Sequence, residues 1–404
     1  MTQEDDREFP QEKELREQAV KAEDGGNKAH LVKSIQIHST GSSSLYALAL
    51  WAALSLLTLD FSTGLKALLP SLAWYGMVAA TAFLILRTGR VSRWRAVFFA
   101  VMAWAFVLNF KARSLGLSGS AFVAPDIQEV PYCHIAIASS FLNYVYYQYL
   151  AVMSGHWPRW GPLTLGVLWL VVTLTLGQAW CSWACFYGGL DETFSRLRRK
   201  PWLRWVHLPG NLRELPAAIL LACALLSLTT LVPVFCLWAC PLKLTTGFLD
   251  PNDAVRKIQL GMFILLGTLA LVVGPLLTKK RIFCGLICPF GAWQAFVGRI
   301  SPFRVTIQAD RCNNCGLCLM SCPTFAIQGE GLPRPEITPY CNRCGECVFV
   351  CTRGAVGYTL AGCGTRDASL LFVFCALLVG GAVGGLFVPE AMLRVFRAAR
   401  GLLP

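Results

Sequence analysis

Charged residues are scarce in this sequence. Asp, Glu, Lys and Arg make up 15% of its 404 residues, against about 25% in an ordinary soluble domain. Hydrophobic residues make up 55%, which exceeds the usual share of about 45–50%. This composition argues against a soluble globular enzyme.

Several catalytic and cofactor motifs are missing as well. The sequence has no Gly-rich phosphate loop, no convincing Ser/His/Asp arrangement and no paired carboxylates suited to acid and base catalysis. It also lacks the C-x2-C-H motif that attaches haem covalently. We therefore assign no catalytic residue, and we expect any covalent cytochrome to be a separate protein.

Residues 1–43 form a charged tail with nine acidic and six basic side chains. No basic start is followed directly by an apolar core and a small-residue cleavage site, so we expect no secretory signal peptide. We expect this tail to lie in the cytoplasm.

Long apolar runs dominate the rest of the chain. A helix needs roughly 17–25 mainly apolar residues to cross a bilayer. Seven runs approach or reach that length, in residues 45–61, 67–86, 94–110, 160–180, 215–235, 258–277 and 368–388. We predict an α-helical polytopic membrane protein of about seven spans. Its bundle occupies residues 44–299, and the last span and a C-terminal tail occupy residues 363–404.

The formal net charge of +13 indicates membrane topology and no nucleic-acid partner, because basic residues cluster in short loops between spans. Such loops favour the cytoplasmic side of the inner membrane. The clustered residues are Arg87, Arg90, Arg93, Arg95, Arg196, Arg198, Arg199, Lys200, Arg204, Lys279, Lys280 and Arg281. All three loops share one side only if residues 133–153 do not cross. Their tyrosines favour an interfacial segment, and an eighth crossing is the alternative.

The strongest motif is a repeated C-x2-C-x2-C-x3-C run, which binds clusters in bacterial ferredoxins. Three close thiolates hold one [4Fe-4S] cluster, and the fourth reaches the other cluster. The predicted ligands are Cys312, Cys315, Cys318 and Cys351 for the first cluster, and Cys341, Cys344, Cys347 and Cys322 for the second. Zinc is the alternative, although two zinc sites would not need the doubled pattern. We predict a small α+β 2[4Fe-4S] ferredoxin-like domain in residues 300–362, facing the cytoplasm.

Two cysteine pairs with C-x3-C spacing follow the fourth and sixth predicted spans. They are Cys181 with Cys185, and Cys284 with Cys288. Positions i and i+4 share one face of a helix, so each pair presents two sulfurs together on the predicted cytoplasmic side. Four thiols there suit a third cluster, another thiophilic metal or a dithiol relay. Ordinary buried cysteines are the alternative.

These two pairs, the hairpin of spans between them and the ferredoxin repeat resemble NapH, the membrane ferredoxin of periplasmic nitrate reductase systems. The membrane half of NosR and the CcoG-type accessory proteins share this plan, and the resemblance covers about residues 160–360. It implies a membrane iron–sulfur protein that passes electrons between the quinol pool or a cytoplasmic donor and an exported partner. By position, both pairs match paired cytoplasmic motifs of the family, although Phe186 replaces the usual proline after the first pair.

A third C-x3-C pair departs from this plan. Cys236 and Cys240 fall in a loop predicted to lie outside, on the same side as Cys133 and His134. Together these four residues would suit a metal, or a redox dithiol that exchanges electrons with an exported protein. A structural disulfide with a free Cys133 is an equal alternative.

Two functions follow from the motifs. In the first, the chain is a lipid-embedded electron-transfer subunit between quinol or a cytoplasmic donor and an exported redox protein or cytochrome, and quinone would be a further ligand. In the second, it is a maturation or regulatory protein that reduces copper or a disulfide for an exported metalloenzyme. The outer pair, Cys236 and Cys240, distinguishes the two.

Overall fold

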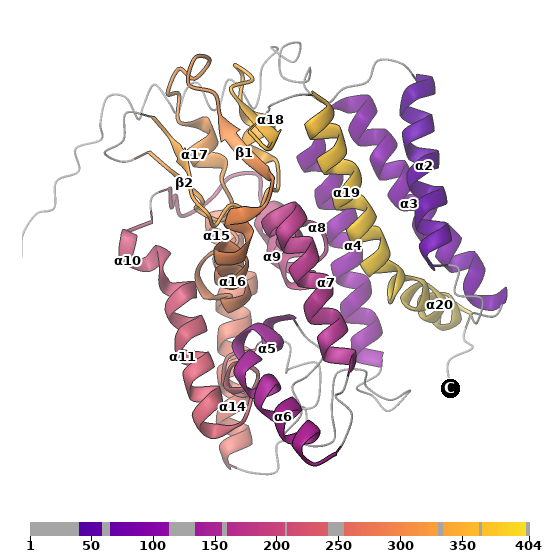
Figure 1. Cartoon of the computed structure of the whole chain (residues 1–404). Helices are drawn as coiled ribbons and strands as arrows, with labels where there is room; N and C mark the ends of the chain where they lie inside the picture. Colours follow the sequence, from indigo (N-terminus) through magenta and orange to yellow (C-terminus); the bar gives the residue numbers. More distant parts are fainter. Residues whose placement is uncertain are drawn as a thin grey trace, which may run out of the picture.

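The computed structural model describes residues 40–58, 65–112, 134–155, 160–206, 208–240, 254–329, 334–362 and 366–400. These residues form a helical bundle with a small strand-containing domain at one end (Figure 1). Cys133 and most of the charged tail predicted over residues 1–43 lie outside the described residues.

Helices of very different length make up the bundle. They are α2 (Thr40–Thr58), α3 (Leu65–Thr88), α4 (Val91–Ala112), α5 (His134–Ser139), α6 (Phe141–Met153), α7 (Trp160–Leu176), α8 (Trp180–Trp183), α9 (Phe186–Leu197), α10 (Gly210–Arg213), α11 (Leu215–Thr230), α12 (Val234–Trp238), α14 (Ala254–Leu266), α15 (Gly274–Thr278), α16 (Pro289–Val297), α19 (Arg366–Gly385) and α20 (Val388–Ala399). Tighter or wider helical turns extend some of them, namely η2 (Gly177–Ala179), η3 (Gly267–Val273), η4 (Phe283–Ile287) and η5 (Gly298–Ile300).

Five stretches among the described residues are helical, long and apolar enough to cross a membrane. They are Leu68–Thr88, Val91–Leu108, Gly166–Trp183, Lys257–Thr278 and Arg366–Gly385. The first and fifth predicted spans correspond to shorter apolar helices, Ser42–Leu56 and Leu215–Thr230. The fold is therefore a mostly helical one with five candidate spans, and the count of about seven stays a prediction.

Residues 134–153 form two short helices, α5 and α6. The longer one, α6, has 13 residues, which is about 20 Å of helix against a hydrocarbon core about 30 Å thick. α6 lies at the end of the bundle far from the strands, and α5 lies between it and α16 (Figure 1). This arrangement agrees with the interfacial segment that the sequence predicts. It argues against an eighth crossing.

The strand-containing domain has two small antiparallel sheets and two short helices. Its elements are β1 (Phe303–Ile307), α17 (Leu317–Ser321), β2 (Ile327–Gln328), β3 (Glu336–Ile337), α18 (Glu346–Val350) and β4 (Val356–Leu360). β1 pairs with β4, and Phe303 stands opposite Leu360, so the first and last strands of the domain lie side by side. α19 then carries the chain back into the bundle.

Two segments turn back inside the bundle, and they bring the C-x3-C pairs to one place. After α7, η2 and α8, helix α9 returns along α4. Phe186 at its start stacks on Phe106 with ring centroids 3.7 Å apart, whereas Glu192 further along binds Arg95 near the start of α4. After η3, α15 and η4, helix α16 reverses direction in the same way and packs against α11.

Candidate functional site

The eight cysteines of the ferredoxin repeat surround two separate hollows. The first hollow is lined by Cys312, Cys315, Cys318 and Cys351. The second is lined by Cys322, Cys341, Cys344 and Cys347. In each hollow three cysteines come from one repeat and the fourth from the other, which is the crossed arrangement of a two-cluster ferredoxin. The structure thus groups these residues as the spacing predicts.

The two ferredoxin repeats position their last cysteines alike. The sulfur atoms of Cys322 and Cys351 each accept a backbone hydrogen bond at 3.2 Å from the amide four residues later. The equal geometry follows from the equal sequence spacing of the two repeats.

The ferredoxin cysteines need a cation to become thiolates. Burial raises the pKa of Cys341 to about 11 and that of Cys344 to about 12, whereas a metal-bound thiol is deprotonated outright. Among the described residues, no three His, Cys, Asp or Glu side chains come close enough together to hold a single metal ion. Hollows lined by four cysteines suit a [4Fe-4S] cluster, because the cluster places its own irons and sulfides between the thiolates.

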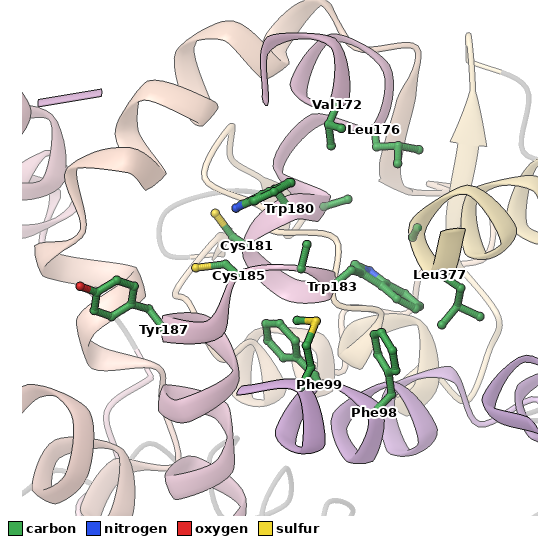
Figure 2. Packing of buried hydrophobic residues seen from close by; sticks show 14 of the residues in the cluster. Phe98, Phe99, Val172, Leu176, Trp180, Cys181, Trp183, Cys185, Tyr187 and Leu377 are labelled. Atoms are coloured by element: carbon green, nitrogen blue, oxygen red, sulfur yellow. The ribbon is translucent and has the colours of Figure 1, made fainter. Parts of the chain in front are cut away.

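A second group of four cysteines lies in the bundle, where the two reversing segments meet. Cys181 interacts electrostatically with Cys185 and Cys288, and Cys284 interacts with the same two residues. The sulfurs of Cys181 and Cys185 point the same way from their segment (Figure 2). The two C-x3-C pairs therefore come together, and we call these four residues the four-cysteine centre.

The four-cysteine centre has approximate two-fold symmetry in sequence and in contacts. Asp191 and Gln294 take the same place, six residues after the second cysteine of each pair. The Cys181 thiol donates to Gln294 Oε1 at 2.9 Å, and the Cys284 amide donates to Asp191 Oδ2 at 2.9 Å. Each half thus supplies the side chain that fixes the first cysteine of the other half.

Two helices begin at the four-cysteine centre. Cys185 is the N-cap of α9, and Cys288 is the N-cap of α16. Burial raises the pKa of Cys185 to about 11, although backbone hydrogen bonds from Gly188 and Tyr187 act in the opposite direction. A helix N-terminus carries partial positive charge and favours an anion. The centre therefore suits a negatively charged group.

Several buried donors near this centre lack a hydrogen-bond partner within the described part of the chain. They are Trp169 Nε1, Trp180 Nε1, and Nε and Nη1 of Arg281. A buried donor without a partner costs about 1–3 kcal/mol. Trp180 directly precedes Cys181 and lies beside it (Figure 2). Sulfur atoms of a bound cluster accept hydrogen bonds, so these donors and the four cysteines fit a [4Fe-4S] cluster.

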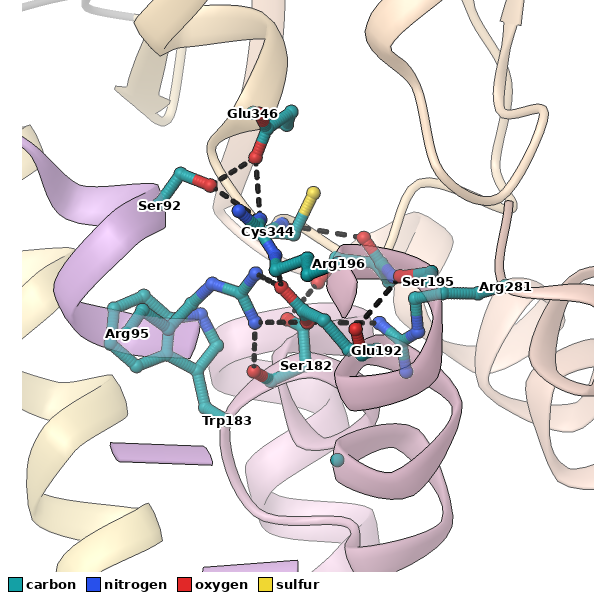
Figure 3. Close-up of polar contacts among 12 residues, drawn as sticks. Ser92, Arg95, Ser182, Trp183, Glu192, Ser195, Arg196, Arg281, Cys344 and Glu346 are labelled. Carbon is teal, nitrogen blue, oxygen red and sulfur yellow. Dashed lines mark hydrogen bonds and ion pairs between the residues drawn. The ribbon is translucent and has the colours of Figure 1, made fainter. Parts of the chain in front are cut away.

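A buried ion pair lies between the four-cysteine centre and the ferredoxin domain (Figure 3). Arg95 Nη1 donates to Glu192 Oε2 at 2.8 Å, and Nη2 donates to the other carboxylate oxygen. Arg95 also donates to the Ser182 carbonyl at 2.7 Å. Burial alone would raise the pKa of Glu192, but Arg95 and two further arginines outweigh burial and lower it to about 2. Glu192 is thus a fixed negative charge at neutral pH.

Arg281 connects this ion pair to the four-cysteine centre. Its Nη1 lies 3.9 Å from Glu192 Oε2. Its Nη2 donates to the Cys181 carbonyl at 2.7 Å and to Cys284 Sγ at 3.2 Å. The side chain is completely buried. A guanidinium is always charged in proteins, so it places a permanent positive charge beside the cysteines.

The ferredoxin domain docks directly on the two reversing segments. Ser182, between the cysteines of the first pair, donates to the Asn342 carbonyl next to the second hollow. Lys280 Nζ donates at 2.7 Å to the carbonyl of Cys322, which lines that hollow. The second ferredoxin hollow and the four-cysteine centre are therefore adjacent sites.

Family models match the same segments. A model described as a 4Fe-4S binding domain matches residues 159–204, 215–251 and 260–308, and each match contains one C-x3-C pair. A model described as a 4Fe-4S dicluster domain matches residues 304–352, which contain the ferredoxin repeat. No solved structure matches the chain.

Several curated relatives carry the name ferredoxin-type protein. The chain is 28% identical to YccM of Escherichia coli (strain K12), over 40% of this chain and 46% of YccM. It is 30% identical to the methylamine utilization ferredoxin-type protein MauN of Paracoccus denitrificans (strain Pd 1222), over 44% of this chain and 62% of MauN. It is 28% identical to the ferredoxin-type protein NapH of E. coli (strain K12), over 43% of this chain and 57% of NapH.

The matches to the two 4Fe-4S family models and to NapH and NosR support a likeness of this part of the chain to NapH/NosR-type 4Fe-4S ferredoxins. The chain spans about half to just under two thirds of the length of the relatives described above. The five candidate spans and the two family models indicate a membrane protein with 4Fe-4S binding domains.

The third C-x3-C pair approaches the four-cysteine centre. Tyr187 Oη and Cys240 Sγ are 2.9 Å apart, and Tyr187 follows Cys185 by two residues. Cys236 and Cys240 are both buried. The sequence predicts this pair in an outside loop and gives no reason to expect contact with the first pair.

The predicted outer set of Cys133, His134, Cys236 and Cys240 is only partly visible. His134 Nε2 lies 3.2 Å from Cys185 Sγ, so this histidine contacts the four-cysteine centre. Cys133 lies outside the described residues. A metal or dithiol site formed by the four residues stays a prediction.

Charged residues are the part of the site that the sequence misses. The positive-inside rule places Arg95 and Arg281 in loops that face the cytoplasm. In the structure both side chains are completely buried and belong to the charge network around Glu192. One signal was available, because Arg281 precedes Cys284 by three residues. The signal is weak, since a basic residue after a span also fits the positive-inside rule.

Proposed function

We propose that this chain is a membrane-bound electron-transfer protein that relays electrons through two ferredoxin clusters and a third cluster in the four-cysteine centre. The observation that carries the proposal is the direct contact between the second ferredoxin hollow and that centre, made by Lys280 and Ser182. Iron–sulfur clusters supply one-electron redox chemistry when bound. The chain's own residues supply thiolate ligands, hydrogen bonds to sulfur, and a buried environment that excludes water.

The donor in this proposal is the quinol pool or a cytoplasmic protein, and the acceptor is an exported redox protein. Three basic loops gather at the ferredoxin end: Lys279 donates to the Arg199 carbonyl at 2.9 Å, and Ser92 binds Glu346 of the ferredoxin domain. Basic short loops favour the cytoplasmic side. This grouping supports a ferredoxin domain on the cytoplasmic face of the inner membrane.

The contact between Tyr187 and Cys240 supports a route towards the other face. The helix that carries Cys236, α12, contacts α5 and α14, and α6, which follows α5, lies at the end of the bundle far from the ferredoxin domain (Figure 1). In this proposal the Cys236–Cys240 pair is the last group of the chain before the exported acceptor.

The first test is the content of iron and acid-labile sulfide in anaerobically purified protein. We expect about twelve irons per chain for three clusters and about eight for the ferredoxin pair alone. Changing Cys181 and Cys284 together to Ser should remove about four irons. The matched control changes Cys223 and Cys375, which lie in α11 and α19 outside every motif, and should remove none. About eight irons in the unmodified protein would refute the third cluster.

The third C-x3-C pair also favours a second candidate function, a maturation or regulatory protein that reduces copper or a disulfide of an exported metalloenzyme. Under this reading, Cys236→Ser with Cys240→Ser abolishes reduction of the client but leaves cluster reduction intact. Reduction of the client that survives this double change, together with loss of electron delivery to an exported cytochrome, would reject it in favour of the electron-transfer function.

A further inference from the structure

The two halves of the four-cysteine centre carry different charges at equivalent positions. Three residues before the first cysteine of each pair stand Gln178 in one half and Arg281 in the other. Gln178 Nε2 donates to the Gly291 carbonyl at 3.0 Å, away from sulfur. Arg281 donates to Cys284 Sγ. One half therefore has a neutral amide where the other has a guanidinium against a sulfur atom.

Arg281 also touches the ferredoxin domain through its backbone. Its amide donates at 2.7 Å to the carbonyl of Pro323, and Pro323 follows Cys322, which lines the second hollow. A chain of short contacts thus runs from Cys322 through Pro323 to Arg281 and on to Cys284. Its guanidinium also interacts electrostatically with Cys284 and with Cys344 of the second hollow.

The surroundings hold this guanidinium in place. Glu192 lies on one side of it, and the Cys181 carbonyl accepts from it at 2.7 Å. Gly188 lies directly against it, because a Cβ at that position would be 2.3 Å from Arg281 Nη2. The Nε and Nη1 atoms of Arg281 have no hydrogen-bond partner among the described residues. A fixed donor beside Cys284 with two nitrogen atoms that donate no hydrogen bond is suited to sulfur atoms of a bound cluster.

We propose that Arg281 is the positioning residue that couples the second ferredoxin cluster to the four-cysteine centre and raises the reduction potential of that centre. This inference rests on the third cluster of the proposed function. One electron leaves the second ferredoxin cluster and one electron enters the four-cysteine centre, so no proton or further reactant is needed. The added negative charge arrives beside Arg281, whose charge and hydrogen bond to Cys284 stabilise the reduced state.

The physical reason is the low dielectric around a buried charge. Interactions between charges grow several-fold when water is excluded, and the potentials of iron–sulfur clusters follow net charge and hydrogen bonds to sulfur. Glu192 opposes the effect of Arg281, because its carboxylate would disfavour an added electron. Changes at the two residues should therefore move the potential in opposite directions, which general damage to the fold would not do.

The test is a potentiometric titration of the intact protein in lipid nanodiscs, with each cluster followed by its EPR signal. Arg281→Gln places a glutamine three residues before Cys284, as Gln178 stands three residues before Cys181 in the other half of the four-cysteine centre. We expect the ratio of reduced to oxidised four-cysteine centre at a fixed potential to fall at least about tenfold, which is a shift of about 59 mV for one electron. The cluster of Cys312, Cys315, Cys318 and Cys351 should not shift and serves as the internal reference.

Two further variants keep the inference testable if Arg281→Gln fails to assemble. Arg281→Lys retains the charge but not the planar fork of donors, so it should shift the potential in the same direction by a smaller amount. Glu192→Gln should shift it in the opposite direction. Arg394→Gln on α20, which pairs with Glu390 within its own helix, is the matched control and should shift nothing.

The outcomes separate this inference from the proposed function. Three clusters with an unchanged potential in Arg281→Gln, or shifts of the same sign in Arg281→Gln and Glu192→Gln, would overturn the role of Arg281 alone. If the titration of the unmodified protein shows only two clusters, the third cluster is refuted and the inference falls with it.

Discussion

Cys322 and Cys344 line the same hollow although they belong to different repeats of the ferredoxin domain. The chain therefore cannot complete either cluster from one repeat. α17 and α18 pack against each other, and this contact brings the fourth cysteine of each repeat to the opposite hollow. Loss of Cys322 or Cys351 should accordingly damage a cluster whose other ligands lie in the other repeat.

The first prediction concerns this crossed ligation. Cys322→Ser should remove up to about four irons, the content of one [4Fe-4S] cluster. Adding Cys344→Ser should remove no more, because both residues serve one cluster, whereas adding Cys318→Ser should remove about four more. Iron analysis of the three proteins is the measurement. If adding Cys318→Ser caused no further loss of iron, and adding Cys344→Ser caused a further loss of about four irons, each repeat would hold its own cluster.

The second prediction concerns the space above Gly188. A methyl group there would lie 2.3 Å from Arg281 Nη2 and 2.3 Å from the Cys181 carbonyl oxygen. Overpacking of this kind costs about 1–3 kcal/mol. Gly188→Ala should therefore lower the thermal midpoint and weaken the four-cysteine centre, as measured by unfolding in detergent and by iron content.

Gly166→Ala on α7 is the control for Gly188→Ala. A Cβ at Gly166 meets nothing within 4 Å, and replacing glycine by alanine inside a helix stabilises it by about 0.5–1 kcal/mol. An equal loss of stability in both variants would show that the close contact at Gly188 is not the cause.

The third prediction concerns the buried pair of Arg95 and Glu192. Removing one partner of a buried pair costs about 3–5 kcal/mol when the other charge is left without compensation. Arg196 and Arg281 still face Glu192, so Arg95→Gln should lower resistance to denaturant by less than that. Arg394→Gln breaks a pair with Glu390 that is 41% exposed on the carboxylate side, and partly exposed pairs contribute only about 0–1 kcal/mol. Equal effects of the two changes would contradict a structural role for the buried pair.

The fourth prediction concerns Tyr187. Tyr187→Phe removes the hydroxyl that contacts Cys240 and keeps the ring that stacks on Phe283 at 5.3 Å. The lost hydrogen bond costs about 0.5–1.5 kcal/mol, and cluster content should not change. Cys240 should become easier to alkylate, and mass spectrometry of its peptide measures this directly.

Tyr149→Phe is the matched control for Tyr187→Phe. Tyr149 is 59% exposed on α6, whereas Cys240 is buried. Tyr149→Phe therefore removes a tyrosine hydroxyl without changing the surroundings of Cys240. Alkylation of Cys240 should stay at the level of the unmodified protein. A faster reaction in the control, or an unchanged reaction in Tyr187→Phe, would argue that the hydroxyl does not protect Cys240.

The grouping of the ferredoxin cysteines could be predicted because it is mostly local. Three ligands of each cluster fall within seven residues, as in Cys312 to Cys318, so spacing alone limits their geometry. The apolar runs were equally informative, since a bilayer demands a minimum helix length. Counting spans is less secure, because α11 ends at Thr230, before the end of the apolar run that predicts it over residues 215–235.

By itself, the sequence determined the class of this protein: apolar runs for a membrane, a doubled cysteine repeat for two clusters, and C-x3-C pairs that present two thiols each. Tertiary structure decided which pairs meet. Cys181 and Gln294 are 113 residues apart, as Arg281 and Cys181 are 100 apart, and no spacing rule reaches that far. Only the reversal of α9 and α16 inside the bundle brings these residues together, and burial then makes Arg95 and Arg281 part of the site.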